Sequence, residues 1–224
     1  PTPTEIVFAK QDPPELKHPN TLDFAAYKGQ TCTARMRVES VGGGDIVIEG
    51  RENDKPEETY PENSFAEIAQ YCKWRYISLH EYVELNEGPE IWEFLKNIWH
   101  TMQNEVHEGI EATGVLPGGL NVQRKAKYLY ERQHSQEIPQ VRELQLVCAY
   151  AFAAAEQNAD NGTIVTAPTC GSCGVVPAVL LYLQKKYQYS DLRMAHALGV
   201  AGLIGNLIRR NASVSGAECG CQAE

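Results

Sequence analysis

The stretch GPEIWEFLKNIWHTMQNEVHEGIEATG, residues 88–114, carries apolar residues at intervals of three and four. Because an α-helix completes a turn in 3.6 residues, this spacing gathers them on one face. The face comprises Ile91, Phe94, Leu95, Ile98, Trp99 and Met102. The stretch therefore predicts a long amphipathic helix that packs its apolar face into a core.

Helix patterns continue on both sides of this stretch. A cap at Asn63 or Ser64 opens the first of them, and an alanine-rich helix is expected over residues 141–162. Two further helices are expected over Val175–Lys186 and Asp191–Ile208. The second of these is small and apolar, and it is predicted to be buried nearly all round.

The first part of the chain follows a different pattern. Polar and apolar residues alternate there and β-branched types are frequent, which predicts two or three strands. The charged, proline-bearing segment 51–63 is typical of a linker. The expected fold class is therefore α+β, with the C-terminal part of a small α/β, β-rich domain over residues 1–60 and a mostly all-α domain over residues 61–224. Both chain ends are abrupt, so we expect a piece of a longer protein.

Composition and charge exclude several classes of protein. The chain has 224 residues, 43% of them apolar, which is enough for a sizeable core. A net charge of -9 with no cluster of Lys and Arg argues against a nucleic-acid partner. No run of 18 apolar residues predicts a membrane span, and no signal segment opens the chain, so a cytoplasmic protein is expected.

The chain has seven cysteines, an odd number that does not suggest a disulfide framework in a reducing compartment. Three stand singly and are expected to be buried as small apolar residues: Cys32, Cys72 and Cys148. The close pairs Cys170/Cys173 and Cys219/Cys221 need another explanation.

The segment TAPTCGSCG, residues 166–174, places a proline turn and two glycines directly before an expected helix. Its free backbone N–H groups, with Thr169 and Ser172, form a natural cradle for a carboxylate or a phosphate. The helix dipole is expected to lower the pKa of Cys170 or Cys173.

The same cysteines permit other interpretations. A Cys-x-x-Cys pair also suits a redox dithiol or half of a zinc site. Such a thiol-redox or zinc-binding module would use Cys219 and Cys221 as well, although their one-residue spacing is unusual for tetrahedral zinc. An ordinary loop before a capped helix is a third interpretation, and the residues alone leave all three open.

The end of the chain, RRNASVSGAECGCQAE, follows an apolar helix and mixes small residues with hydrogen-bonding ones. Because buried polar groups need partners, a substrate or cofactor is one way to supply them, and a water-facing helix end is the alternative. The polar residues are Asn211, Ser213, Ser215, Glu218 and Gln222.

The histidines offer one further candidate site. His18, in KHPNTLDF, stands where a strand is expected to begin, and it is as readily a surface residue as a catalytic one. His196 lies on the apolar helix and is expected to be a satisfied core histidine. The others are expected on exposed faces with no role: His80, His100, His107 and His134.

Five blocks of sequence together resemble the iron–sulfur-dependent L-serine dehydratases, or L-serine ammonia-lyases, over nearly the whole chain. In order, the blocks are HPNTLDF, SVGGGDI, GVLPGGLNVQRKA, TAPTCGSCGVVPAVL and NASVSGAECGCQAE. The resemblance implies that residues 1–60 match the C-terminal part of the family's β domain. It also implies that residues 61–224 match the first half of its all-α catalytic domain.

The resemblance implies an activity and a cofactor. Such enzymes convert L-serine to pyruvate and ammonia with a [4Fe–4S] cluster held by three cysteines, which leaves one iron open as a Lewis acid. Cys221 falls on the first of these ligands and the other two lie beyond this chain, so the chain is expected to be inactive alone. A homo-oligomer, specifically a dimer, and a place in amino-acid catabolism and gluconeogenesis are also implied.

The resemblance also implies site residues. His18 is the matching catalytic histidine, because the family's serine-rich histidine motif is absent here. Many members have Asn-Gly-Ala in place of residues 170–172, so Cys170 is expected to line the pocket, and Cys219 stands where the family more often has an aliphatic residue. The substrate-binding residues implied are Asn20, Thr166, Thr169, Gly171, Ser172, Asn211, Ser213 and Ser215.

Overall fold

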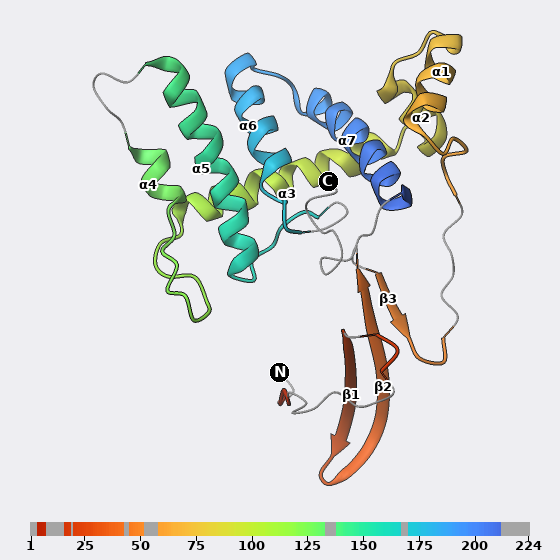
Figure 1. The fold of residues 1–224 in the computed structure, drawn as a ribbon, viewed down its shortest axis with the longest axis vertical. Helices are drawn as coiled ribbons and strands as arrows, with labels where there is room; N and C mark the ends of the chain where they lie inside the picture. Colours follow the sequence, from red (N-terminus) through yellow and green to blue (C-terminus); the bar gives the residue numbers. More distant parts are fainter. Residues whose placement is uncertain are drawn as a thin grey trace. The chain divides into compact units, whose positions relative to one another are not determined.

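The computed structural model describes residues 4–7, 16–18, 20–42, 45–51, 58–132, 138–166 and 170–211. It divides into two compact units, Pro1–Pro56 and Glu57–Glu224, and each is described by itself. Figure 1 shows strands in the first unit and helices in the second, so the expected α+β class is confirmed.

The first unit is a three-stranded antiparallel sheet in the order β1-β2-β3. The strands are β1 (Thr21–Lys28), β2 (Thr31–Gly42) and β3 (Asp45–Ile48). A tight turn at Gly29, whose φ is +62°, joins the first two strands, and Thr21 pairs with Glu39 at the far end. The prediction of two or three strands is confirmed.

The described part of the second unit contains seven helices. They are α1 (Phe65–Arg75), α2 (Leu79–Glu87), α3 (Ile91–Glu111), α4 (Ala126–Glu131), α5 (Pro139–Ala159), α6 (Val175–Tyr187) and α7 (Asp191–Asn211). Capping boxes start α1 at Ser64 and α2 at Ser78, and a proline in the first turn starts α5. The short helix α4 was not expected from the sequence.

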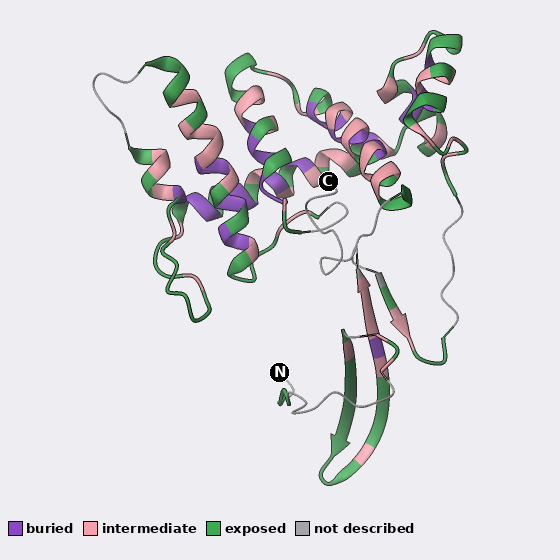
Figure 2. Cartoon of the chain, viewed as in Figure 1, coloured by how far each residue is buried: buried purple, intermediate pink, exposed green. Residues whose placement is uncertain are grey.

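Helix α3 carries the core of the second unit. Figure 1 shows α5, α6 and α7 lying across it, and all three contact it. Figure 2 shows buried residues concentrated along α3 and on the helix faces turned toward it. The main cluster unites α3 with α5, α6 and α7 through Trp99, Met102, Val106, Ile110, Tyr150, Ala153, Ala154, Ala178, Leu181, Met194 and Leu198. The predicted amphipathic helix is therefore confirmed, but Phe94, which was placed on its apolar face, is exposed, and Trp92 is buried.

Backbone-to-backbone contact joins α5 to two neighbours. A Cβ atom at Gly109 of α3 would lie 2.3 Å from the carbonyl oxygen of Ala153. A Cβ atom at Gly174, before α6, would lie equally close, at 2.3 Å, to the carbonyl oxygen of Ala151. Neither carbonyl can move without moving its helix, so both positions require glycine.

Three expectations about burial need correction. Helix α7 is buried along one face only, through Met194, Ala195, Leu198, Gly199 and Leu203, and it contacts α3 and α2. Cys72 is buried as expected, whereas Cys32 and Cys148 are only half-buried.

Among the described residues, no helix combines the length and the apolar character needed to cross a membrane.

We predict that Gly109→Ala lowers the free energy of unfolding by about 3 kcal/mol, because the added methyl overpacks a backbone contact. Denaturant unfolding of the purified protein measures the change. Gly202→Ala on α7 is the matched control, since a Cβ there meets no atom within 4 Å. The control should be neutral or slightly stabilising, as alanine is the better helix former. Equal loss of stability in both variants would contradict the close contact.

Candidate active site

The residues singled out from the sequence fall into three groups. His18 and Asn20 lie in the strand unit, and Thr166, Gly171, Ser172 and Asn211 lie in the helical unit. Thr169, Ser213, Ser215 and Cys221 lie outside the described residues.

His18 is held at the start of β1. The backbone N–H of Asn20 donates to His18 Nδ1 at 3.2 Å, and the hydroxyl of Thr21 donates to the His18 carbonyl at 2.6 Å. Both hydrogen bonds come from residues within three positions of His18 in the chain. Nδ1 is therefore the acceptor of this hydrogen bond from the backbone.

Of the cradle predicted over residues 166–174, the structure describes Thr166 and residues 170–174, and the latter include a turn at the start of α6. Residues 171–174 make the turn, and the backbone N–H of Val175 donates to the Ser172 carbonyl at 3.0 Å. The side chain of Asn158 on α5 donates to the Cys170 carbonyl at 3.0 Å. Together with the Gly174 contact to Ala151, this hydrogen bond fixes the turn against α5.

The start of α6 has the features of an anion-binding position. Gly174 is the N-cap and no side-chain hydrogen bond caps the helix. The Val175 N–H already donates to the Ser172 carbonyl and Pro177 has no N–H, so the helix dipole is what chiefly favours negative charge at this end. Thr166 and Gly171 are exposed and Ser172 is half-buried, so the turn can be approached from solvent.

The cysteine pair does not behave as expected. Cys173 is buried and its thiol donates to the Ala154 carbonyl, with 3.9 Å between the two atoms. Burial, with smaller contributions from Glu105 and Cys170, raises the pKa of Cys173 to about 11. The prediction of a lowered pKa is therefore wrong for Cys173, because loss of water outweighs the helix dipole. Cys170 lies exposed in the same turn.

We predict that a thiol reagent modifies Cys170 of the folded protein well before Cys173, which should react only as the protein unfolds. The thiolate is the nucleophile, and Cys173 is both buried and held in its neutral form. Peptide mass mapping after timed exposure to iodoacetamide follows the two sites separately. Equal rates at the two thiols would show that Cys173 is not packed as described.

A buried carboxyl that the sequence analysis missed lies beside this turn. Glu105 on α3 is 1% exposed, and its Oε2 accepts the backbone N–H of Val165 at 2.8 Å. Its Oε1 has no hydrogen-bond partner among the described residues. Burial raises the pKa of Glu105 to about 7, and the bond from Val165 opposes this shift. Its place three residues after Met102 on the apolar face was a signal available in the sequence.

We predict that Glu105→Gln removes a pH dependence of stability. The folded pKa of about 7 exceeds the reference value of 4.5, so the neutral carboxyl favours folding fully below pH 4.5. This contribution is lost as the pH rises through 7, which amounts to about 3 kcal/mol. Cys173 stays neutral over this range.

Denaturant unfolding at pH values from 4 to 8 checks the prediction. The variant should gain stability relative to the wild type as the pH rises. Glu93→Gln, which changes an exposed carboxylate in the first turn of α3, should show no such trend and serves as the control. Parallel pH curves for the wild type and Glu105→Gln would rule out the raised pKa.

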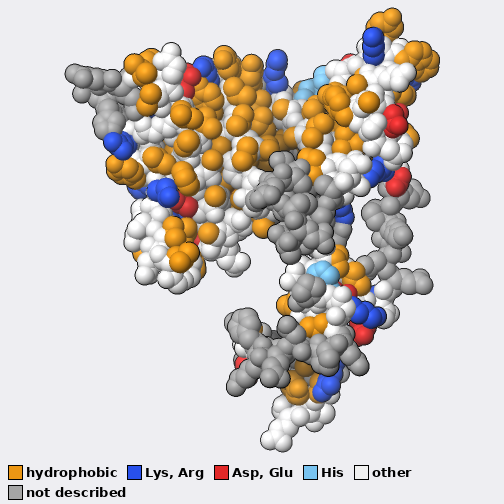
Figure 3. All heavy atoms as spheres, viewed as in Figure 1, with side chains coloured by type: hydrophobic (Ala, Val, Ile, Leu, Met, Phe, Trp, Pro, Cys, Tyr) orange, Lys and Arg blue, Asp and Glu red, His pale blue; other side chains and the backbone are white. Residues whose placement is uncertain are grey.

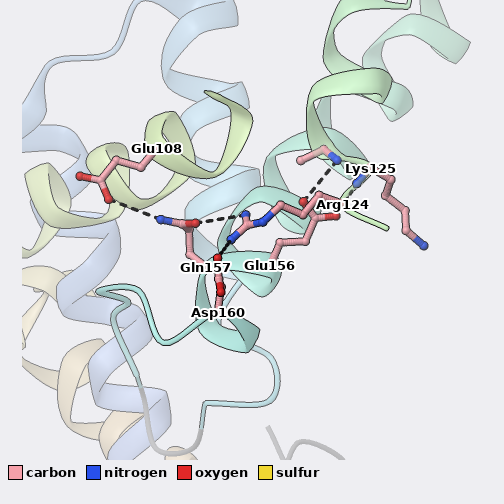
Figure 4. Close-up of polar contacts among 7 residues, drawn as sticks. Glu108, Arg124, Lys125, Glu156, Gln157 and Asp160 are labelled. Carbon is pink, nitrogen blue, oxygen red and sulfur yellow. Dashed lines mark hydrogen bonds and ion pairs between the residues drawn. The ribbon is translucent and has the colours of Figure 1, made fainter. Parts of the chain in front are cut away.

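A second polar network holds the C-terminal end of α5. The chain leaves α5 there and continues toward the turn before α6. Figure 4 shows Arg124 bridging Asp160, at 2.5 Å, and Gln157, at 3.2 Å. Glu156 is buried and its carboxylate accepts the N–H of Lys125 at 2.7 Å, which caps the start of α4 from a distant part of the chain. This network joins the block GVLPGGLNVQRKA to α5, and the sequence analysis missed it.

Asn211 is not brought to the turn by any contact within the described part of the chain. It is exposed at the last position of α7, and its side chain donates to the Leu207 carbonyl of the same helix at 2.8 Å. In the described structure, Asn211 therefore acts as a local helix-end residue.

Two histidines lie in a separate place, away from the turn. His196 is half-buried and stacks on His80 with 4.5 Å between ring centroids, and Trp92 makes a T-shaped contact with the same ring at 4.6 Å. Burial, and then His80, lower the pKa of His196. A cavity of about 630 Å³ borders this stack along α6 and α7. His196 is thus less buried than expected, and His80 is more buried than an exposed face implies.

Comparison with known proteins identifies the family. The family model described as "Serine dehydratase alpha chain" matches residues 30–224. The chain is 37% identical to L-serine dehydratase 2 of Escherichia coli (strain K12), over 92% of this chain and 48% of the relative. It is 35% identical to the L-serine dehydratase of Streptomyces coelicolor, over 98% of this chain and 53% of the relative.

These matches place the chain among the serine dehydratases, the class of protein whose sequence blocks it carries. The chain belongs to the serine dehydratase alpha chain family. It spans about half the length of the curated relatives it matches.

Proposed function

We propose that the full-length protein containing this chain is an L-serine ammonia-lyase, which converts L-serine to pyruvate and ammonia. The observation that carries the proposal is family membership over residues 30–224, together with relatives whose names are L-serine dehydratase. In this proposal, residues 1–60 are the C-terminal part of the β domain and residues 61–224 begin the catalytic domain.

The turn before α6 supports a role in holding the substrate carboxylate. No side chain caps the start of α6, and the helix dipole favours an anion at this end. In the proposal, Thr166, Thr169, Gly171 and Ser172 line this position. Asn20, Asn211, Ser213 and Ser215 are proposed as further substrate contacts on the family resemblance, and His18 as the base that takes the α-proton.

The implied [4Fe–4S] cluster does not fit the cysteines that the structure describes. The thiol of Cys173 is buried and donates to the Ala154 carbonyl, whereas Cys170 lies exposed. No group of three His, Cys, Asp or Glu side chains gathers in the described part of the chain. The cluster is therefore proposed on Cys221 and on ligands outside this chain, where its open iron would supply Lewis-acid chemistry when bound.

The burial of Cys173, whose thiol donates to the Ala154 carbonyl while Cys170 lies exposed, weighs against the alternative of a thiol-redox or zinc-binding module built on this pair. A carboxylate cradle needs no thiolate at either position. We therefore keep the lyase as the one function proposed.

A cytoplasmic homodimer is part of the proposal. Figure 3 shows apolar side chains gathered on the viewed surface of the helical unit. Apolar patches of this kind often mark interaction surfaces. Exposed apolar residues on α5, α6 and α7 include Val141, Leu144, Phe152, Val175, Val176, Val179 and Leu192.

We predict that the full-length protein, purified without oxygen, contains iron and sulfide and forms pyruvate from L-serine. Cys221→Ser should remove both the bound iron and the activity, because serine is a poor ligand for a soft iron–sulfur site. Cys219→Ser is the matched control and should keep both. Iron and sulfide analysis with a pyruvate assay measures the outcome. A fully active, iron-loaded Cys221→Ser protein would refute the assignment.

A further inference from the structure

Two stacked histidines join helices α2 and α7. The rings of His80 and His196 lie 4.5 Å apart between centroids, with 16° between their planes, and Trp92 of α3 makes a T-shaped contact with the His196 ring. Both histidines are half-buried. The function proposed above assigns neither of them a role.

The stack belongs to the contact that holds α2 in the helical unit. An apolar cluster joins α2 to α3 and α7 through Tyr82, Val83, Trp92, Ala195 and Leu203. His80 lies two residues before Tyr82, and His196 directly follows Ala195, so the half-buried rings border this cluster. A change in the charge of either ring therefore acts at the contact between α2 and α7.

Charged groups of both signs surround the His196 ring. On its own helix, Arg193 precedes it by three residues and therefore lies on the same face. On α2, Glu84 lies one turn beyond His80, and its Oε2 accepts the Nε1–H of Trp92 at 2.9 Å. From α6 and the chain that follows it, the neighbouring side chains are uncharged and comprise Leu180, Leu183, Tyr189 and Ser190.

These surroundings favour the neutral form of the His196 ring. Burial, and then His80, lower the pKa of His196 from its usual value of 6.5, while Glu84 opposes the shift and Arg193 adds to it. A lowered pKa means that folding favours the unprotonated ring, so the stack stabilises the fold fully above pH 6.5. This contribution is lost as the pH falls below 6.5. The buried Glu105 has the opposite sign, since its contribution is lost as the pH rises.

A cavity gives protons access to both rings in the folded protein. It has a volume of about 630 Å³, it lies along α6 and α7, and both histidines line it. This volume has room for several water molecules. The rings can therefore exchange protons with solvent while the helices stay folded, which a fully enclosed histidine cannot do.

We propose that the stack of His80 on His196 is a pH-sensitive contact, which holds α2 against α7 when its rings are neutral and loosens α2 when they are protonated. Two positive rings at stacking distance repel each other, and Arg193 adds to the repulsion. Helix α2 is the element that loosens, because it is only nine residues long and packs chiefly on α7. The inference does not depend on the proposed lyase function, since it uses none of the residues assigned to that site.

Amide hydrogen exchange of the full-length protein at pH 7.5 and pH 5.5 tests the proposal. After correction for the intrinsic pH dependence of exchange, the amides of α2 should exchange about fivefold faster at pH 5.5. The amides of α5 should change by less than about twofold, because a local opening of α2 leaves the core helices closed.

Three variants separate the stack from other sources of pH dependence. His196→Gln removes the titrating ring, so the exchange of α2 should become the same at both pH values. His196→Arg carries a positive charge at both pH values, so α2 should exchange fast even at pH 7.5. His100→Gln is the matched control, since His100 is exposed on α3 with its Nδ1 3.2 Å from Gln103 Oε1, and it should keep the wild-type response.

Several outcomes would overturn the proposal. One is equal exchange of α2 at the two pH values in the wild type, and another is an equal rise in α5. A full pH response in His196→Gln, or slow exchange of α2 at pH 7.5 in His196→Arg, would do the same. If His196→Arg does not fold, the comparison of His196→Gln with His100→Gln decides the matter by itself.

Discussion

The helical unit depends on the direct backbone contact of α5 with two neighbours. At Gly109 it meets α3, and at Gly174 it meets the turn that starts α6, each time with no room for a side chain. Helices that touch in this way cannot slide or rotate independently, because backbone atoms do not repack as side chains do. The position of the turn before α6 relative to α3 is therefore fixed through α5, and the candidate site inherits that rigidity.

Buried polar groups add further contacts between these helices and the irregular chain that joins them. Arg124, Glu156 and Gln157 join the chain before α4 to the end of α5, and Glu105 joins α3 to the chain before α6. The Glu156 carboxylate accepts two backbone N–H groups, whereas one Glu105 oxygen has no partner in the part of the chain that the structure describes. Folding accounts for the Glu156 carboxylate, whereas the Glu105 carboxyl is retained at a cost in stability. Sites that hold a ligand often show such a cost.

The sequence predicted the regular elements well where the signal was local. Apolar spacing located α3, α6 and α7, and the cap at Ser64 located the start of α1. Helix α4 was missed because Glu156, thirty-one residues from Lys125 in the chain, caps it. The candidate turn was located correctly as a helix start, but the pKa of Cys173 was expected to shift in the wrong direction. The sequence predicts the helix dipole, which lowers the pKa of a thiol at a helix start. It does not predict that the Cys173 thiol is buried against Ala154.

The sequence by itself determined the α+β class, the order of the main helices and the family blocks, since each depends on residues close together in the chain. Only the tertiary structure decided which faces are buried and which polar groups meet. It left α7 covered on one side, stacked His196 on His80 and placed Glu105 under the turn before α6. Such outcomes depend on contacts between segments sixty or more residues apart, and a helical period carries no information about the partner it will meet.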